Sequence, residues 1–269
     1  MKVFVSIDME GITGVTDRGD VVGGQEGYER FRTLMVCDLN AAIEGAFAGG
    51  ATEVLVNDSH FHMRNVLIEQ LDSRAQLISG FTKRGLMMHG LSRSFDAVYF
   101  LGYHSRIGTE SGVLNHTILG KEVDGIWIND QEMGGTGLNA ALAGYYNVPV
   151  AMISGDDRVC KEAKDLLGDV ETAVTKYAAD GYAARCLPQG ATHPLIKEAA
   201  GRALSRLADF KPYRIEGPVT FKVCFHSTSA AAISTMIPTV EKVDARTVVV
   251  RGDDYLRAYT TTMAVLLLA

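Results

Sequence analysis

Three short apolar segments each run into side chains that can bind a metal ion, and this feature constrains the fold more than any other. Residues 3–7, 52–57 and 96–103 are rich in Val, Leu, Ile and aromatic side chains, as buried strands are. The side chains that follow them are two carboxylates and two imidazoles: Asp8, Glu10, His60 and His104. Ligands of open α/β sheets bind beyond the carboxyl ends of the strands, so we expect these four side chains to converge on one crevice.

A mixed set of carboxylates and imidazoles suits zinc or a similar divalent ion, and two ions can share one carboxylate. The sequence therefore predicts a metal-dependent hydrolase. The alternative for Asp8 and Glu10 is an exposed turn after an edge strand. We disfavour it because acids at the end of an apolar strand need partners, and because Gly11 permits a ligand to approach closely.

Strand and helix patterns alternate through the first two thirds of the chain. Residues 29–47 carry apolar side chains at three- and four-residue steps, which is typical of an amphipathic helix. Further strands are expected at residues 76–79, 125–129 and 148–154, and further helices at residues 137–146 and 158–167. This alternation predicts an α/β fold with a mostly parallel sheet and helices on both faces.

The pattern changes after about residue 170. A helix is expected at residues 193–207, strands at 219–226 and 246–251, and a final helix at 253–268. We therefore expect an α/β metal-binding domain over residues 1–170 and a smaller C-terminal α+β subdomain over residues 171–269.

The composition argues against several kinds of partner and location. The formal net charge is −6 without a cluster of Lys or Arg, which does not favour binding to nucleic acid. No apolar stretch approaches the ~18 residues of a membrane-spanning helix, and the N-terminus lacks the features of a signal peptide. The four cysteines are widely spaced, as free thiols in a reducing cytoplasm are. We expect a cytoplasmic protein that binds neither nucleic acid nor membranes.

The histidines and the acids near them have different expected roles in the site. His60 lies closer to its strand end than His62, so His60 is the expected ligand, with Asp58 placed to orient it. His116 lies in a polar loop, from which a general base or nucleophile could reach the crevice. One acid of the 156–157 pair is expected to cap the helix that follows. Three other histidines fit packing or surface positions: His89, His193 and His226.

Seven ordered motifs in the first 160 residues resemble those of the DppA-type zinc-dependent D-aminopeptidases. They are SIDMEGI (6–12), TEVLVNDSH (52–60), FLGYH (100–104), IND (128–130), GLNA (137–140), AGYYNVPV (143–150) and GDDR (155–158). The match in the tail is thinner, around residues 236–238 and 258–259.

The resemblance implies a site with two zinc ions per chain. Asp8 corresponds to the bridging ligand, Glu10, His60 and His104 to further ligands, and His116 to the catalytic histidine. It also implies the release of N-terminal D-amino acids, such as D-Ala, from short peptides by a metal-activated water. The resemblance further implies a ring-shaped homo-oligomer whose inner chamber admits only small peptides.

The chain departs from the family's pattern at one position. The fifth ligand of the family is a glutamate two residues before the GLNA motif, where this chain has Gly135. Glu132 is the nearest substitute, and it could reach the site only if the glycines at 134 and 135 rearrange. The second ion is therefore expected to bind more weakly than the first.

Two other functions remain open on the sequence. An aspartate-based, magnesium-dependent phosphatase is suggested by the strands that lead into Asp8 and into residues 155–157, but it leaves the strand-end histidines without a role. A non-catalytic metal- or peptide-binding relative is suggested by Gly135. Release of phosphate from a generic ester would favour the first, and ligand binding without turnover would favour the second.

Overall fold

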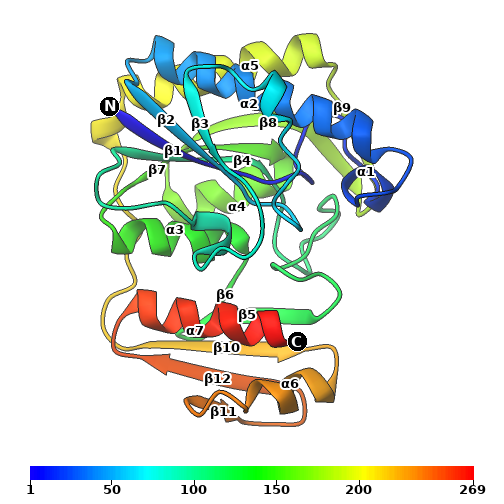
Figure 1. Ribbon diagram of the computed structural model, residues 1–269, viewed down its shortest axis with the longest axis vertical. Coiled ribbons are helices and arrows are strands. Elements are labelled where there is room, and N and C mark those ends of the chain that lie inside the picture. The colour runs from blue at the N-terminus through cyan, green and yellow to red at the C-terminus, as the bar shows by residue number, and fades with distance from the viewer.

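A seven-stranded sheet forms the centre of the fold in the computed structural model, which describes residues 1–269 (Figure 1). All neighbouring strands pair in parallel except the last two, so the predicted mostly parallel sheet is confirmed. In spatial order the strands are β3 (Ala75–Ile78), β2 (Glu53–Asp58), β1 (Lys2–Ile7), β4 (Ala97–Tyr103), β7 (Val150–Asp156), β8 (Glu171–Asp180) and β9 (Ala183–Cys186).

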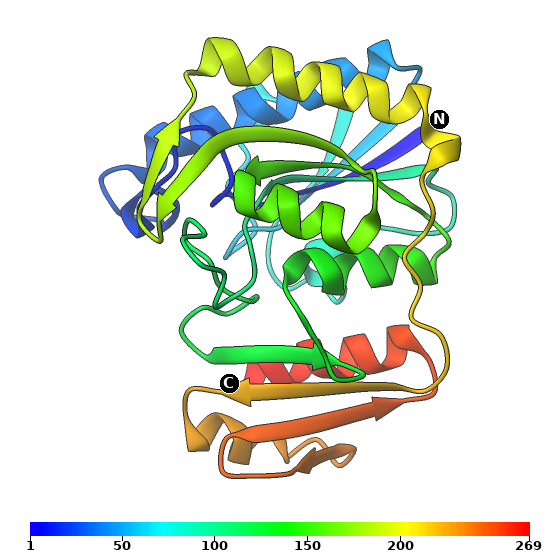
Figure 2. The same cartoon turned by 180° about the vertical axis from the view of Figure 1, so that it is seen from behind.

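Helices cover both faces of this sheet, also as predicted. One face is covered by α2 (Tyr28–Ala48) and α5 (Gln189–Ser205), and the other by α3 (Gly135–Tyr145) and α4 (Asp157–Leu167) (Figures 1 and 2). The single-turn helix α1 (Arg18–Val21) lies in the long connection after β1, and the 3-10 helices are η1 (Ile68–Gln70), η2 (Leu86–Met88) and η3 (Leu207–Asp209). Asp156 caps α4 by accepting a hydrogen bond from Val159 N, which is the capping role expected for one acid of that pair.

The two faces of β1 pack into different cores because alternate side chains of a strand point in opposite directions. Val3, Val5 and Ile7 lie in the core beneath α2 and α5. Phe4 lies in the core on the α3 side, and Ser6 is buried on that side against Met87. All of β4 is buried, as the unbroken apolar run predicts for a central strand.

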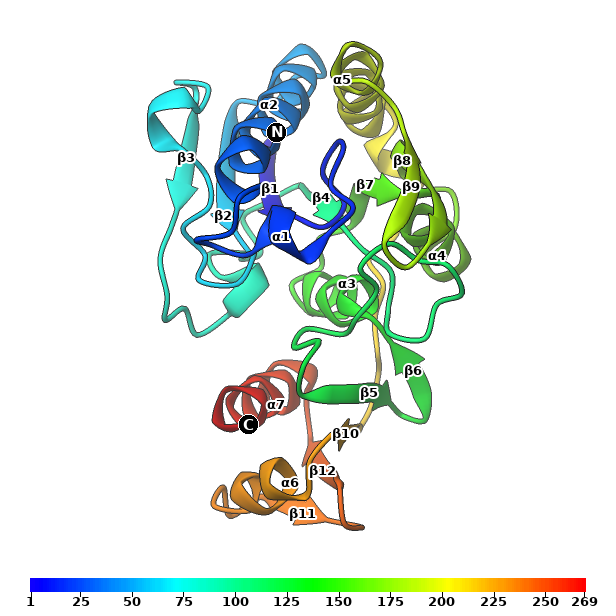
Figure 3. The ribbon, with the colours of Figure 1, turned by 90° about the vertical axis from the view of Figure 1, so that its right-hand side faces the viewer.

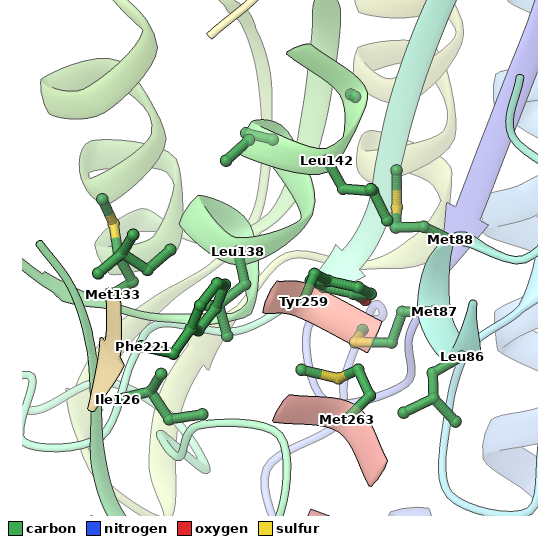
Figure 4. Packing of buried hydrophobic residues seen from close by; sticks show 14 of the residues in the cluster. Leu86, Met87, Met88, Ile126, Met133, Leu138, Leu142, Phe221, Tyr259 and Met263 are labelled. Carbon is green, nitrogen blue, oxygen red and sulfur yellow. The ribbon is translucent and has the colours of Figure 1, made fainter. Parts of the chain in front are cut away.

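A second, antiparallel sheet lies beyond α3. Its strands, in order, are β11 (Val240–Lys242), β12 (Thr247–Gly252), β10 (Val219–Phe225), β5 (Val123–Ile128) and β6 (Gln131–Met133). Helices α6 (Thr228–Ser234) and α7 (Tyr255–Leu268) pack on it, and α7 lies between this sheet and α3 (Figures 1 and 3). Figure 4 shows side chains of both regions together, with Leu138 of α3 beside Phe221 of β10 and Tyr259 of α7. One hydrophobic core therefore joins the second sheet to the first.

The sheets do not follow the boundary expected at residue 170. Strands β8 and β9 lie after that residue but extend the first sheet, and β5 and β6 lie before it but belong to the second. The hairpin of β5 and β6 leaves the first sheet after β4, and the chain returns to it through α3 and β7. A single boundary along the sequence cannot describe a chain that leaves the first sheet and later returns to it.

None of the helices combines the length and the apolar character that are needed to cross a lipid bilayer.

Candidate metal centre

The loops that follow β1, β2 and β4 meet at the carboxyl edge of the first sheet, which faces the viewer in Figure 3. Backbone hydrogen bonds continue past the strand ends, from Asp8 N to Leu101 O and from Ser59 N to Ile7 O, both 2.8 Å. The four expected metal ligands are all buried there: Asp8, Glu10, His60 and His104. The convergence that the sequence predicted is therefore present in the structure.

A bulge at the end of β4 aims His104 at the site. Gly102 has a φ of +64°, and the pairing of β4 with β7 shifts register at this point. As a result Phe100 and Tyr103 lie on the same face, with stacked rings whose centroids are 4.5 Å apart. A Cβ at Gly102 would lie 2.3 Å from Asp8 O, so only glycine fits here.

His60 is held between two carboxylates. Its Nδ1 lies 3.0 Å from Asp8 Oδ1 and 3.2 Å from Glu10 Oε2, while its Nε2 lies 2.8 Å from Val21 O. Because a carbonyl only accepts, Nε2 carries the hydrogen. A neutral His60 then presents the lone pair of Nδ1 to two carboxylates, which is unfavourable unless a proton or a metal cation lies among them.

Asp58 does not orient His60, contrary to the expectation from the sequence. Its carboxylate accepts hydrogen bonds from the backbone of Asn65 and Val66 and from the Asn65 side chain. It fixes the loop after β2 instead, and the backbone carbonyl of Val21 orients the imidazole of His60.

A second group of ligand atoms joins Glu10 to two stacked histidines. The rings of His104 and His116 are 3.9 Å apart and inclined by 17°. His104 Nδ1 lies 3.0 Å from Ser105 O, and His116 Nδ1 lies 2.9 Å from Leu114 O. Both rings therefore donate from Nδ1 to the backbone and keep Nε2 free, as metal-binding or proton-accepting imidazoles do.

These contacts divide the site into two candidate positions for a cation. Ligand atoms of Asp8, Glu10 and His60 all lie within 4.8 Å of one another, and so do those of Glu10, His104 and His116. Asp8 reaches toward both, because its other oxygen lies 3.6 Å from His104 Nε2.

The ionisation of the cluster reflects its burial. Burial and the neighbouring Glu10 raise the pKa of Asp8 to about 7. Burial opposes the charge of Glu10 as well, but the neighbouring His60 holds the pKa of Glu10 well below the usual range of a glutamate. Glu10 and Asp8 in turn hold the pKa of His60 well above the usual value of a histidine. Burial and the nearby His116 lower the pKa of His104 to about 3. The cluster is thus two acids that compete for one positive partner.

The donor set fits a bound metal. Glu10 Oε2 is buried and makes no hydrogen bond, and its one ionic partner is His60 Nδ1, at 3.2 Å. His60, His104 and His116 each commit one ring nitrogen to a backbone carbonyl, and the other nitrogen of His60 and of His104 faces the carboxylates. This is the arrangement that commonly fixes the tautomer of metal-binding histidines.

Space is open at Gly135, where the resemblance implies a fifth ligand, and Glu132 makes its contacts elsewhere. Gly135 is the first residue of α3, and a Cβ added there would meet only Ile118 Cδ1, at 3.9 Å. Glu132 lies on β6 and forms an ion pair with Arg106 Nη1 at 2.7 Å. It belongs to neither group of candidate ligands.

The other histidines lie outside the site. His62 is exposed, His89 is half-buried and accepts a hydrogen bond from Gly85 N, and His193 and His226 pair with Asp38 and Asp124 respectively. The sequence analysis missed one residue that supports the site, which is Lys176 of β8. Its Nζ is buried and donates to the backbone oxygens of Glu10, Ile12 and Val15. No sequence signal marks it, because its partners are backbone atoms.

Comparison with known proteins gives one consistent result. The Peptidase M55 family, described as D-aminopeptidase, matches residues 1–264. The D-aminopeptidase of Bacillus subtilis (strain 168) is 39% identical over 270 residues, covering 100% of this chain and 98% of that protein. The solved structure of the Zn-dependent D-aminopeptidase DppA from Bacillus subtilis, a self-compartmentalizing protease, has a TM-score of 0.96 at 39% identity and covers 100% of this chain and 97% of its own. The resemblance found in the motifs is confirmed, and the chain belongs to the M55 family of D-aminopeptidases.

Proposed function

We propose that this peptidase uses zinc to release N-terminal D-amino acids, such as D-Ala, from short peptides. The observation that carries the proposal is the buried pair of carboxylates at His60, which needs a cation to be stable. Two further findings support it: the likeness over the whole chain to a Zn-dependent D-aminopeptidase, and the two overlapping groups of ligand atoms. The residues that hold zinc in this proposal are Asp8, Glu10, His60 and His104.

Zinc bound in this cluster supplies Lewis acidity, which polarises a carbonyl and lowers the pKa of an activated water to about 7. Asp8 faces both ligand groups, so it is the residue suited to hold two ions together. Val21 O and Ser105 O keep His60 and His104 in the tautomers that leave a lone pair for the metal.

In this proposal His116 moves the proton. Its Nδ1 is fixed to Leu114 O, so its Nε2 is free to accept a hydrogen from the attacking water. The protonated ring then donates its proton to the leaving amine, or stabilises the negative charge that develops on the oxygen of the scissile carbonyl. The stacked ring of His104 limits its rotation. The proposed partners are small peptides that begin with a D-amino acid, and further copies of this chain in a ring-shaped homo-oligomer.

Elemental analysis with matched histidine variants tests the metal site. The purified protein is expected to contain at least one zinc per chain, and His104→Ala is expected to lose most of it. His62→Ala is the control, because His62 is exposed in the loop beside His60 and belongs to neither ligand group. Equal zinc in the wild type and in His104→Ala would show that the site is misassigned.

Hydrolysis of a D-Ala amide and of its L-Ala counterpart tests the reaction, with release of phosphate from an aryl phosphate measured in parallel. Turnover of the D-amide alone supports the proposal. Zinc binding without turnover of either amide would identify a binding protein. Magnesium-dependent release of phosphate would identify the phosphatase that the strand-end acids also suggested.

A further inference from the structure

A chain of buried polar side chains lies directly beneath the candidate metal centre. Ser6 Oγ of β1 lies 2.8 Å from Ser59 Oγ, 2.8 Å from Tyr103 Oη of β4 and 2.8 Å from the backbone oxygen of Met87. Asn57 Nδ2 of β2 joins the same group through Ser59 Oγ at 3.0 Å and Met87 O at 2.8 Å. All these side chains are buried, in a sheet whose other inward residues are mostly apolar.

Each strand that leads to a candidate ligand places at least one member of this group at or just beyond its end. Ser6 stands two residues before Asp8, Ser59 one before His60, and Tyr103 one before His104. The backbone ladders that join neighbouring parallel strands do not by themselves fix where the loops beyond the strand ends place their side chains. A hydrogen bond between side chains at the last positions does limit that movement.

Tyr103 is the member that connects the most elements. Asn139 Nδ2 of α3 donates to Tyr103 Oη at 2.9 Å, so the hydroxyl hydrogen of Tyr103 is free to donate to Ser6 Oγ. Tyr259 of α7 donates to Asn139 Oδ1 at 3.3 Å, which extends the chain of hydrogen bonds to the helix that packs on the second sheet. Figure 4 shows Tyr259 surrounded by buried apolar side chains.

We propose that Tyr103 is a positioning residue for the metal centre, and that its hydroxyl holds the ends of β1, β2 and β4 at the spacing that the ligands require. The proposal rests on the function proposed above, in which those strand ends hold zinc. Residues that support metal ligands from behind commonly change metal affinity by about 10–100-fold when they are removed. The hydroxyl of Tyr103 makes no hydrogen bond to any of the proposed zinc-binding side chains. Its effect on zinc affinity therefore passes through Ser6 and through the backbone of the next residue, His104.

The chain offers a matched control on the same strand. Tyr99 of β4 is also buried, and its hydroxyl donates a single hydrogen bond to Ala200 O of α5 at 2.6 Å, on the opposite face of the sheet. Tyr99→Phe and Tyr103→Phe each remove one buried hydroxyl and keep the ring. Each variant loses some general stability, which is measured as Tm for both, whereas an effect on the metal centre should appear only in Tyr103→Phe.

Zinc affinity by competition with a chromophoric chelator, and the visible absorption of the Co²⁺-substituted protein, provide the readouts. We expect Tyr103→Phe to bind zinc at least ~10-fold more weakly than Tyr99→Phe and to show a changed Co²⁺ spectrum. Ser6→Ala should give a similar loss, and the double variant little more, because both substitutions break the same chain.

The outcomes separate this proposal from the function on which it rests. Equal zinc affinity and identical Co²⁺ spectra in Tyr99→Phe and Tyr103→Phe, with tight binding by the wild type, overturn the positioning role alone. Failure of the wild type to bind zinc overturns both. If Tyr103→Phe does not fold, Ser6→Ala measured against Tyr99→Phe decides the question by the same criteria.

Discussion

His116 combines one committed ring nitrogen with one free nitrogen beside a pair of buried ligands. Replacing it by alanine keeps Asp8, Glu10 and His60 in place, so His116→Ala should retain its zinc. Its hydrolysis of a D-Ala amide should fall by about 10²–10⁴-fold, the usual contribution of a general acid or base. Metal content and rate should be measured on the same preparation. Loss of zinc together with activity would instead identify His116 as a ligand, which its distance to Glu10 and His104 also permits.

In the proposed site, Gly135 stands where the family resemblance implies a carboxylate ligand. Each negative ligand offsets part of the repulsion between two divalent ions, so the second ion should bind more weakly than the first. We expect a titration of the metal-free protein with zinc to show two phases, with activity rising on the weaker one. A Cβ at position 135 meets no atom closer than 3.9 Å, so the backbone there has space for the start of a side chain, and Gly135→Glu should merge the two phases.

Glu132→Gln is the control for this prediction. Glu132 pairs with Arg106 and lies outside both ligand groups, so its substitution should leave both phases of the titration unchanged. Two equally tight ions in the wild type would show that another residue compensates for Gly135, and loss of one of them in Glu132→Gln would identify that residue.

Among the structural elements, β8 supports the loop that carries Glu10. Lys176 Nζ donates to Glu10 O at 2.6 Å, Ile12 O at 2.9 Å and Val15 O at 2.7 Å, and Thr175 Oγ1 donates to Gly11 O at 2.7 Å. Lys176→Met would leave three carbonyls without this donor, and a buried group left unpaired costs about 1–3 kcal/mol. We expect a lower Tm for the metal-free variant.

The effect of zinc on this variant separates support of the metal loop from support of the fold. A ligand stabilises the folded state according to its affinity for it, so the rise in Tm on adding zinc should be smaller in Lys176→Met than in the wild type. An equal rise in both proteins would limit Lys176 to a general role in folding.

The elements that the sequence predicted well are those with a strong periodic pattern. The mostly apolar runs at residues 3–7 and 96–103 form strands, and the three- and four-residue spacing in 29–47 is helix α2. From these alone, the convergence of Asp8, Glu10, His60 and His104 follows, because parallel strands end at one edge. The bulge at Gly102 and the role of Val21 O did not follow, since both depend on backbone geometry that side-chain patterns do not encode.

Strand β8 illustrates the opposite case. Its sequence, ETAVTKYAAD, contains a lysine and a terminal pair of alanines, so it lacks the apolar run of a buried strand. Lys176 is nevertheless buried, because the carbonyls of another loop compensate its charge. A residue whose burial depends on distant backbone atoms cannot be recognised from its neighbours in the sequence. The sequence analysis therefore did not expect β8 as a strand of the first sheet beyond residue 170.

At the scale of the whole molecule, the two sheets share one core, and apolar side chains remain on the outside. Met236 is 75% exposed and Ile233 43% exposed, one turn apart at the end of α6, and Leu267 and Leu268 are exposed at the end of α7. Exposed apolar groups on a folded chain often mark surfaces where subunits associate. The structural relative with a TM-score of 0.96 is a self-compartmentalizing protease, and the homo-oligomer proposed above for this chain needs a surface of this kind.

We therefore expect light scattering at micromolar concentration to give a mass several times that of the 29.1 kDa chain. If the surface at the end of α6 takes part, Met236→Glu should lower that mass, because association would bury a carboxylate without a partner. Phe61→Glu is the comparison, since Phe61 is 59% exposed but lies in the loop after β2, far along the chain from α6.

An enclosed chamber would also admit short D-Ala peptides and exclude a folded protein with the same N-terminus. A wild-type mass near 29.1 kDa, or equal cleavage of both substrates, would contradict the proposed ring.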